Sequence, residues 1–216
     1  MKSKPGKDGP DVRAKLLDAA VRLFAEQGVA GTTVAEIARR AGVTSAMVHY
    51  YFKTKDQLLD AVAAEKLVGE FIAFVAGELD RGQPEPLALV EHLVWRIVEA
   101  SDAWPWLPPL WVREVISQGG ALREKLIQRV DLGKPERFKA GIAAAQKAGR
   151  VNPEINPQLT FMSIMALTML PLSMAKDWDR IPLIGRVSKP ELGRHVVALL
   201  QHGLAAAPAK TQGRKA

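Results

Sequence analysis

The 216-residue chain contains no cysteine and only two tyrosines. The absence of cysteine excludes a disulfide framework and any thiolate-based zinc or nucleophilic site, and it is typical of the cytoplasm, where we expect this protein to act. The longest apolar run, residues 159–175, falls short of the roughly 20 residues of a membrane span and contains Pro171, so it predicts a buried helix. Residues 1–10 carry lysines but lack the apolar stretch of a signal peptide, and we expect a disordered basic tail.

Sequence motifs of the common enzyme classes are also missing. The chain has no H-E-x-x-H, no G-x-S-x-G, no P-loop and no dinucleotide-binding glycine motif. Its histidines are few, and His195 with His202 on one expected helix face is a weak arrangement for a metal. We therefore predict no enzymatic activity, no cofactor and no metal site.

Positive charge is concentrated near the N-terminus. The net charge is +7, and residues 1–55 hold 10 Lys and Arg against 5 Asp and Glu, whereas the rest of the chain holds 20 against 18. A basic module suggests a polyanionic partner such as DNA, although a solvated surface has the same composition.

Helical periodicity dominates the chain, 48% of whose residues are hydrophobic, and no convincing strand alternation is present. We predict an all-α fold with a three-helix N-terminal module at 11–55, a larger helical domain at 56–206 and a disordered tail at 207–216. The expected helices cover 12–27, 33–40, 45–51, 55–79, 87–102, 108–117, 119–131, 135–148, 157–176 and 189–206.

Capping signals define the short helices of the N-terminal module. Thr33 with Glu36 forms a T-x-x-E capping box, Gly42 follows at a position that favours positive φ, and Thr44 precedes the next helix. Two short helices joined by a glycine-containing turn are typical of a helix-turn-helix, whose second helix enters the DNA major groove.

The second of these helices has one face suited to DNA. If Val48 is buried, helical spacing turns small and polar residues toward the groove, where Ser45 to Met47 read base edges and His49 and Tyr50 hold phosphates. Lys55 at a helix N-terminus opposes the helix dipole, so we expect a phosphate there. The predicted DNA-binding residues are Thr33, Thr44, Ser45, Ala46, Met47, His49, Tyr50 and Lys55.

Two of these assignments have a structural alternative. Of the consecutive rings Tyr50, Tyr51 and Phe52, we assign the last two to the core and Tyr50 to DNA. His49 is either a phosphate contact or a plain surface histidine.

The segment "TTVAEIARRAGVTSAMVHYYFKTKDQLLDAV" resembles the DNA-binding region of the TetR (tetracycline repressor) family, with matching residues over about 12–62. Its T-hydrophobic-x-x-I-A-x-x-A-G-V-S/T signature, aromatic cluster and lysine agree together, but His49 stands where the family usually has tyrosine. The resemblance implies a homodimer whose C-terminal helices 157–176 and 189–206 form the interface, and a small-molecule effector in the C-terminal domain.

Two C-terminal features are candidates for the effector site. The segment "WPWLPPLWVRE" contains Trp104, Trp106 and Trp111 before Arg113, and it either packs in the core or lines a pocket for an apolar or aromatic compound. Met162, Met165 and Met169 share a helical stripe that either packs against a neighbouring helix or lines a cavity.

The sequence thus predicts a TetR-like transcriptional regulator, a repressor that an apolar or aromatic effector releases from a palindromic operator. The alternative is a helical effector-binding or scaffold protein without specific DNA binding.

Overall fold

The computed structural model describes residues 9–77, 85–131, 133–182 and 185–205, and within these ranges every regular element is a helix. The predicted all-α class is confirmed. An isolated antiparallel bridge joins Val151 to Ala205. The predicted tail at 207–216 and most of that at 1–10 lie outside the described residues.

The first part of the chain follows the predicted order closely. Its elements are α1 (Gly9–Gln27), α2 (Val34–Ala41), α3 (Ser45–Tyr51), α4 (Lys55–Ala61), the π-helical segment η1 (Val62–Ile72) and α5 (Ala73–Ala76). Helix α1 begins three residues earlier than the predicted residue 12, so Asp11, a candidate cap for the predicted helix, lies in its first turn.

Helix α2 begins and ends as its sequence predicts. The Thr33 side chain accepts a hydrogen bond from the Glu36 amide, and the Glu36 carboxylate accepts one from the Thr33 amide. The hydrogen bonds that the Glu36 carboxylate accepts, first from the Thr33 amide and then from the Thr33 hydroxyl, lower the pKa of Glu36. Gly42 ends the helix with φ of 70° and ψ of 30°.

Replacing Gly42 with alanine is expected to lower the free energy of unfolding by about 1–2 kcal/mol, the cost of the left-handed conformation for a residue with a Cβ. No atom lies within 4 Å of the added Cβ, so the cost is conformational and not steric. Urea unfolding of both proteins measures it, and the same change at Gly203, where the added Cβ also meets nothing within 4 Å and no left-handed φ is involved, is the control. Equal losses at both sites would contradict this account.

The long helix predicted at 55–79 is continuous from α4 through η1 to α5 but differs in its hydrogen bonding. Thr54 caps it by accepting from the Gln57 amide at 3.1 Å. The central segment η1 is π-helical, a wider turn that sequence periodicity does not reveal and that is often found at functional sites.

The second part of the chain departs more from prediction. Its elements are α6 (Pro86–Ala103), α7 (Leu107–Leu110), the π-helical η2 (Trp111–Ile116), α8 (Arg123–Ile127), α9 (Gly133–Lys147), α10 (Pro157–Ser173), the 3-10 helix η3 (Ala175–Arg180) and α11 (Lys189–Leu204). The predicted helix 119–131 is reduced to α8. Gly119 adopts φ of 77°, and a Cβ on Gly120 would lie 2.3 Å from the Glu114 carbonyl oxygen, so these glycines form a tight turn.

The two C-terminal helices, α10 and α11, begin where the sequence predicts. Helix α10 continues through Pro171, as the predicted range 157–176 requires, and ends at Ser173, three residues earlier than predicted. A capping box between Ser188 and Glu191, with a proline in the first turn, begins α11 at Lys189, where the predicted helix 189–206 also begins.

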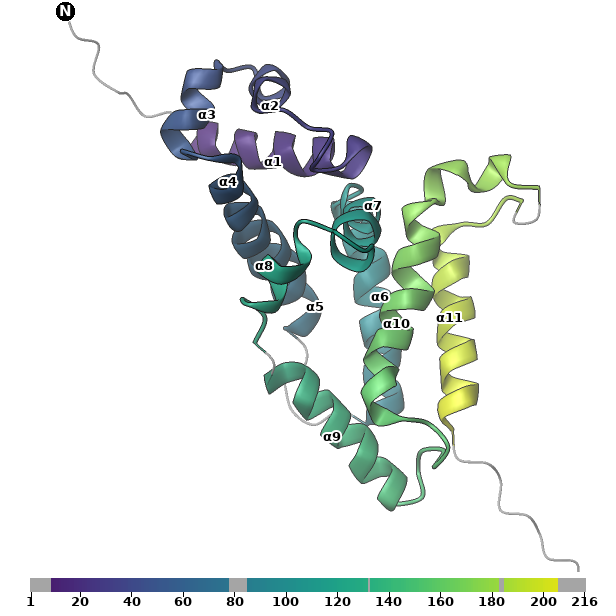
Figure 1. The fold of residues 1–216 in the computed structure, drawn as a ribbon. Coiled ribbons are helices and arrows are strands. Elements are labelled where there is room, and N and C mark those ends of the chain that lie inside the picture. The colour runs from purple at the N-terminus through teal and green to yellow at the C-terminus, as the bar shows by residue number, and fades with distance from the viewer. Residues whose placement is uncertain (1–8, 78–84, 132, 183–184, 206–216) are drawn as a thin grey trace, which may run out of the picture.

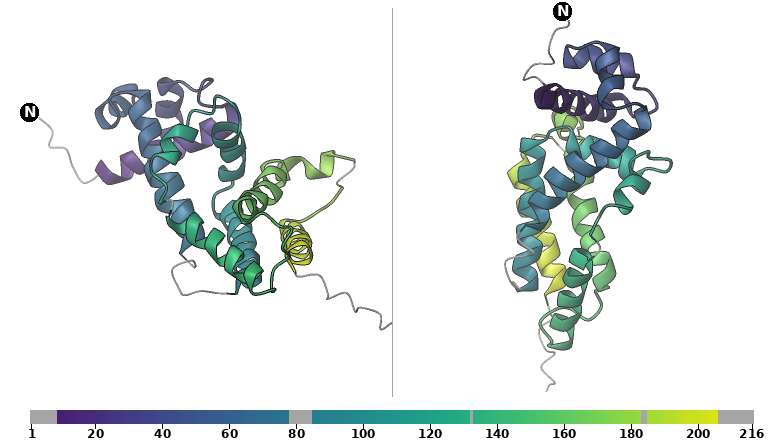
Figure 2. Two further views of the ribbon diagram at one scale, coloured as in Figure 1. Left: turned by 60° about the horizontal axis from the view of Figure 1, so that its bottom comes forward. Right: turned by 90° about the vertical axis from the view of Figure 1, so that its left-hand side faces the viewer.

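Helices α1, α2 and α3 lie together at one end of the molecule (Figure 1). Helix α4 leads away from them, and α9 lies toward the opposite end, as a second direction of view also shows (Figure 2). Helices α10 and α11 pack side by side along one flank. One buried cluster includes Phe24, Ile37 and Val48 of the N-terminal module as well as Leu93 and Met169 of the C-terminal half.

Candidate nucleic-acid interface and adjoining cavity

Helix α3 buries one side and presents the other to solvent. Val48 is 1% exposed and holds the helix to the core, whereas Tyr50 is 75% exposed. The other exposed residues are Thr44, Ser45, Ala46 and His49, and Met47 is half-buried. The structure therefore brings the predicted base-reading and phosphate-binding side chains of α3 onto one accessible surface, which we call the reading face.

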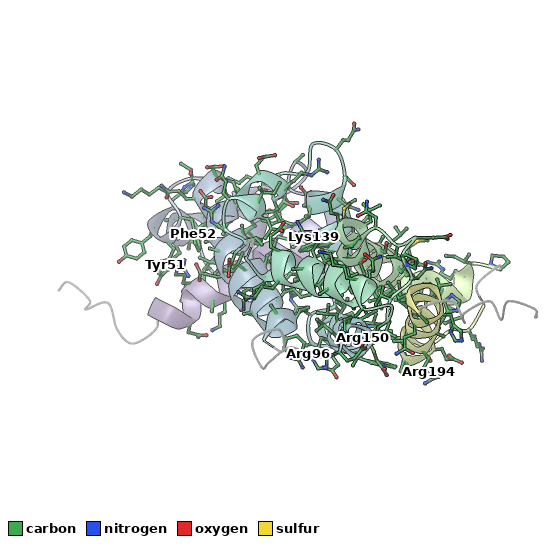
Figure 3. All side chains as sticks on the ribbon, turned by 90° about the horizontal axis from the view of Figure 1, so that it is seen from below. Tyr51, Phe52, Arg96, Lys139, Arg150 and Arg194 are labelled. Carbon is green, nitrogen blue, oxygen red and sulfur yellow. The ribbon has the colours of Figure 1, made fainter. Side chains whose placement is uncertain are left out.

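The aromatic cluster divides as the sequence suggests. Phe52 is 3% exposed and Tyr51 packs partly buried against the core, so both rings are scaffold. The exposed Tyr50 ring stands edge-on to Tyr51, with centroids 5.1 Å apart. Figure 3 shows Tyr51 and Phe52 near one end of the molecule and Arg194 of α11 near the other.

A cation fixes the base of the reading helix. The Arg13 guanidinium of α1 lies 5.2 Å from the Phe52 ring centroid and makes two hydrogen bonds to the Glu65 carboxylate of η1. The hydrogen bonds from Arg13 hold the pKa of Glu65 below its ordinary value. This contact joins α1, η1 and the end of α3.

Replacing Glu65 with glutamine is expected to remove a pH-dependent part of the stability. Because the folded-state pKa of Glu65 is lowered, its contribution is fully present above the ordinary value of 4.5 and disappears as the pH falls through the folded-state pKa. The effect at pH 7 is at most about 1 kcal/mol, since both partners are more than a third exposed. Urea unfolding of both proteins from pH 7 down to acid measures the difference, which is expected to narrow below pH 4.5. A difference independent of pH would contradict the assignment.

Lys55, which we predict to bind a phosphate, also has partners within the protein. Its amine donates to the carbonyl oxygens of Val29 at 2.5 Å and Thr32 at 2.6 Å, in the loop that follows α1. These carbonyls supply the negative charge that we expected from a phosphate, so the unfavourable helix position is compensated within the protein. The position of the Lys55 amine indicates that this side chain holds the loop containing Val29 and Thr32 to the start of α4.

The two threonines predicted to contact DNA, Thr33 and Thr44, differ in their hydrogen bonds. The exposed Thr33 hydroxyl donates to the Glu36 carboxylate at 2.8 Å within the capping box. Thr44 precedes α3 in an extended conformation, but its side chain makes no capping hydrogen bond, contrary to the prediction that it caps this helix. A cap side chain usually accepts from the amide of the second or third helical residue. Here the amide of the third residue, Met47, donates to the Thr44 carbonyl at 3.0 Å instead.

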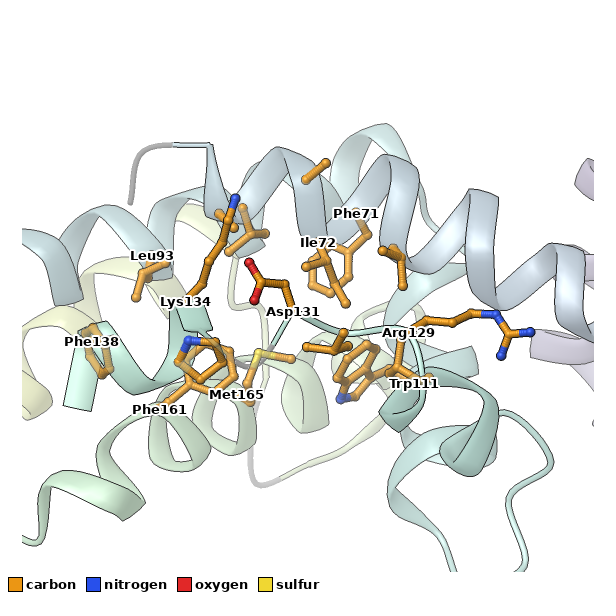
Figure 4. Close-up of a pocket in the computed structure, with 17 residues that line it drawn as sticks. Phe71, Ile72, Leu93, Trp111, Arg129, Asp131, Lys134, Phe138, Phe161 and Met165 are labelled. Carbon is orange, nitrogen blue, oxygen red and sulfur yellow. The ribbon is translucent and has the colours of Figure 1, made fainter. Parts of the chain in front are cut away.

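The helical domain contains a cavity of about 280 Å³. Its walls are mainly apolar and include Phe71 and Ile72 of η1, Trp111 of η2, and Phe161 and Met165 of α10 (Figure 4). The Phe71 and Trp111 rings meet edge to face with centroids 5.4 Å apart. Both π-helical segments of the described chain therefore contribute to the same cavity.

Polar side chains are confined to one part of the cavity lining. They come from Arg129, Asp131 and Lys134. Figure 4 shows Lys134 and Asp131 near one another, while the Arg129 guanidinium points away, and that group binds Asp60 at 2.7 Å. The cavity thus suits an apolar compound with a limited number of polar contacts.

Only two of the predicted effector residues, Trp111 and Met165, line this cavity. Trp104 packs edge-on against Phe74, and Trp106 is 7% exposed in the core. Arg113 donates to the Glu26 carbonyl at 3.2 Å on the surface.

The methionine stripe is divided between different environments. Met169 is fully buried, whereas Met162 is 65% exposed on the outer face of α10. Met162 and Met169 lie seven residues apart, which is only about 20° around a helix of 3.6 residues per turn. Their different exposure therefore reflects what packs against α10 at each level along the helix and not the direction of the side chains. The sequence missed Phe71, Phe161 and Leu93 because long-range packing alone brings them together.

The described residues contain no group of three or more His, Asp or Glu side chains that could hold a metal ion. His195 and His202 are exposed on α11, and a ring nitrogen of His202 bonds its own helix at the Ala198 carbonyl. None of the helices described here is both long enough and apolar enough to cross a membrane.

The short helices, glycine turn and exposed reading face define a helix-turn-helix module attached to a helical domain with an internal cavity. Residues 16–62 match the model of the bacterial regulatory proteins of the tetR family. The chain is 30% identical over 159 residues to the HTH-type transcriptional repressor KstR2 of Rhodococcus jostii (strain RHA1), covering 72% of this chain and 74% of the relative. It belongs to the TetR family of DNA-binding transcriptional regulators, and these relatives are not enzymes.

Solved structures share the fold. The ketosteroid transcriptional regulator KstR2 of Mycobacterium tuberculosis superposes with a TM-score of 0.69 and 20% identity over 90% of this chain and 95% of that one. AibR in complex with isovaleryl coenzyme A and operator DNA gives a TM-score of 0.68 and 19% identity over 87% and 97% of the two chains. Other curated regulators match over less than half of their length.

Proposed function

We propose that this protein is a homodimeric repressor that binds a palindromic operator in the bacterial cytoplasm and leaves it when a small, largely apolar effector occupies the cavity. The observation that carries the proposal is the reading face, where Ser45, Ala46 and His49 are exposed on a helix whose Val48 is buried. We also propose the division into a DNA-binding module at 11–55 and an effector-binding and dimerisation domain at 56–206.

Each predicted DNA-binding residue has a proposed role. Ser45, Ala46 and Met47 are small or flexible enough to approach base edges, and His49 and Tyr50 extend toward phosphates. Thr33 and Thr44 flank the module and contact the DNA backbone through hydroxyl or nearby amide groups. We propose that Lys55 contributes mainly by holding the Val29–Thr32 loop, in keeping with its contacts to those carbonyls.

The proposed dimer uses the exposed sides of α10 and α11. Large apolar side chains stand in solvent there, with Leu159 and Leu170 each 54% exposed and Leu199 52% exposed. A contiguous exposed apolar face is typical of a protein interface. A two-fold axis through this face would place the two reading helices in successive major grooves, about 34–36 Å apart.

The proposed effector is a compact apolar compound with a polar group directed toward Lys134 and Asp131. The apolar walls and the size of about 280 Å³ support an aliphatic, aromatic or short acyl body. One fold relative binds isovaleryl coenzyme A, and two others carry the KstR2 name. The effector would favour a spacing of the reading helices that no longer matches the grooves.

A titration with DNA tests the function. Fluorescence anisotropy of the full chain with its own upstream DNA, and with a scrambled duplex of the same composition, is measured over a series of salt concentrations. We expect at least about 10³-fold tighter binding to the upstream DNA at moderate salt, and a steep loss of affinity for both duplexes as salt rises. Equal affinities throughout would reject specific operator binding and favour a scaffold role.

A further inference from the structure

A buried carboxylate links the DNA-binding module to the helical domain. Glu114 of η2 is 7% exposed. One of its carboxylate oxygens accepts from the Val29 amide at 2.9 Å, and the other accepts from the Ala121 amide at 3.1 Å. Val29 lies in the loop after α1 and Ala121 in the loop before α8, so a single side chain binds the backbone of both parts of the molecule.

The loop is shaped to admit this carboxylate. Gly28, with φ of 81°, precedes Val29, and a Cβ at that position would lie 3.2 Å from the Glu114 carboxylate oxygen. The Glu114 carbonyl accepts from the Leu122 amide at 3.1 Å, which fixes the other end of η2. Both the side chain and the backbone of Glu114 are therefore held in place.

Val29 is also bound from a second direction. Its amide donates to Glu114, and its carbonyl accepts from the Lys55 amine at 2.5 Å. Lys55 is the first residue of the continuous helix formed by α4 and η1. The same residue of the loop is thus held by two helices that come from the effector cavity.

These two helices meet again at the cavity wall. The helix that begins at Lys55 supplies Phe71, and η2 supplies Trp111 one turn before Glu114. Their rings are in edge-to-face contact. A compound bound between Phe71 and Trp111 would press directly on the two helices that hold Val29.

We propose that Glu114, Val29 and Lys55 form a joint through which the state of the cavity wall sets the position of the reading helices. This inference deepens the proposed function and rests on it, because it assigns the residues that couple effector to operator. Helices α1 and α2 flank the loop, so a displacement of Val29 shifts the support of α3. Glu114 acts as a positioning residue, since it lies outside both the reading face and the cavity lining.

Amide hydrogen exchange of the full chain tests the joint without DNA or effector. We expect Trp111→Phe to speed exchange of the Val29 amide by about tenfold, the response to a local loss of protection. The amide of Val21, inside α1, is expected to change less than about twofold. Trp111→Ala is a stronger perturbation, and Trp111→Phe preserves a ring if the alanine variant does not fold. Equal changes at Val29 and Val21 would overturn the proposal.

A double-mutant cycle on operator affinity tests the coupling itself. In the wild-type background, Trp111→Phe is expected to change the operator Kd by about fivefold or more. In the Glu114→Gln background, the same Trp111→Phe substitution is expected to change the operator Kd by less than about twofold. Glu124→Gln makes the same chemical change at an exposed site on α8 and is expected to retain the full response.

The outcomes of the two experiments are distinguishable. The same Trp111→Phe response in Glu114→Gln as in Glu124→Gln would contradict a joint at Glu114. If no variant prefers operator DNA, the proposed function fails, while the exchange of the Val29 amide still decides whether the joint exists.

Discussion

Replacing Ala46 with glutamate is expected to abolish specific operator binding. Ala46 is exposed in the first turn of α3, at the end of the reading face that we place closest to the bases. A carboxylate there faces the phosphates of both strands and removes the close approach that alanine allows. Losses of about 1–3 kcal/mol at each of two half-sites sum to at least about 2 kcal/mol and predict an affinity at least about 30-fold weaker.

The loss in Ala46→Glu is expected without unfolding. A negative charge in the first turn of a helix is favourable because it lies near the positive end of the helix dipole. Folding stability should therefore be unchanged or slightly higher, and urea unfolding checks this. Ala46→Glu is therefore expected to lower the operator affinity without lowering the free energy of unfolding.

The matched control is Ala140→Glu. Ala140 is exposed on α9, toward the end of the molecule opposite the N-terminal module. The Ala140→Glu substitution changes the net charge by the same amount as Ala46→Glu. A general electrostatic effect would therefore weaken DNA binding equally in both variants. Anisotropy titrations at one fixed salt concentration compare them. Similar affinities for the two variants would contradict the assignment of α3 as the reading helix.

The N-terminal module could be predicted from sequence because its determinants are local. The Thr33–Glu36 box, Gly42 and the apolar Val48 each act within a few residues, and the structure has all of them in the expected conformations. The resemblance to the TetR family over the same segment agrees with the family model match.

The cavity could not be predicted to the same degree. The tryptophan-rich segment indicated the region, but Trp104 and Trp106 turn to other partners and only Trp111 reaches the cavity. Which ring lines a cavity depends on how distant helices pack, and the Phe71 and Phe161 contributions come from η1 and α10. The π-helical segments add a change of register that a period of 3.6 residues does not describe.

Lys55 shows how a correct local argument can lead to a different partner. A cation at the start of a helix does require negative charge nearby. The sequence suggested a phosphate, whereas the structure supplies the Val29 and Thr32 carbonyls from a loop more than twenty residues earlier. The local conflict was visible in the sequence, but its solution depends on tertiary structure.

The second large effect is expected from Met162→Glu, which should convert the proposed dimer into monomers. Met162 is 65% exposed in the single chain, among the apolar residues on the outer face of α10. An interface across a two-fold axis would bury this position in both copies, so one substitution buries two carboxylates. An unpaired buried charge costs several kcal/mol, on the order of 3–5.

Loss of the dimer should also remove most operator affinity, because two linked modules bind about 10²–10⁴ times more tightly than one. Sedimentation equilibrium measures the oligomeric state, and anisotropy measures operator binding in the same samples. Ile127→Glu is the matched control, since Ile127 is 56% exposed on α8, outside the proposed interface. We expect Ile127→Glu to remain dimeric and to bind DNA as the wild type does. A Met162→Glu protein that stays dimeric would place the interface elsewhere, because neither α10 nor its two-fold copy could then enclose that carboxylate at so small a cost.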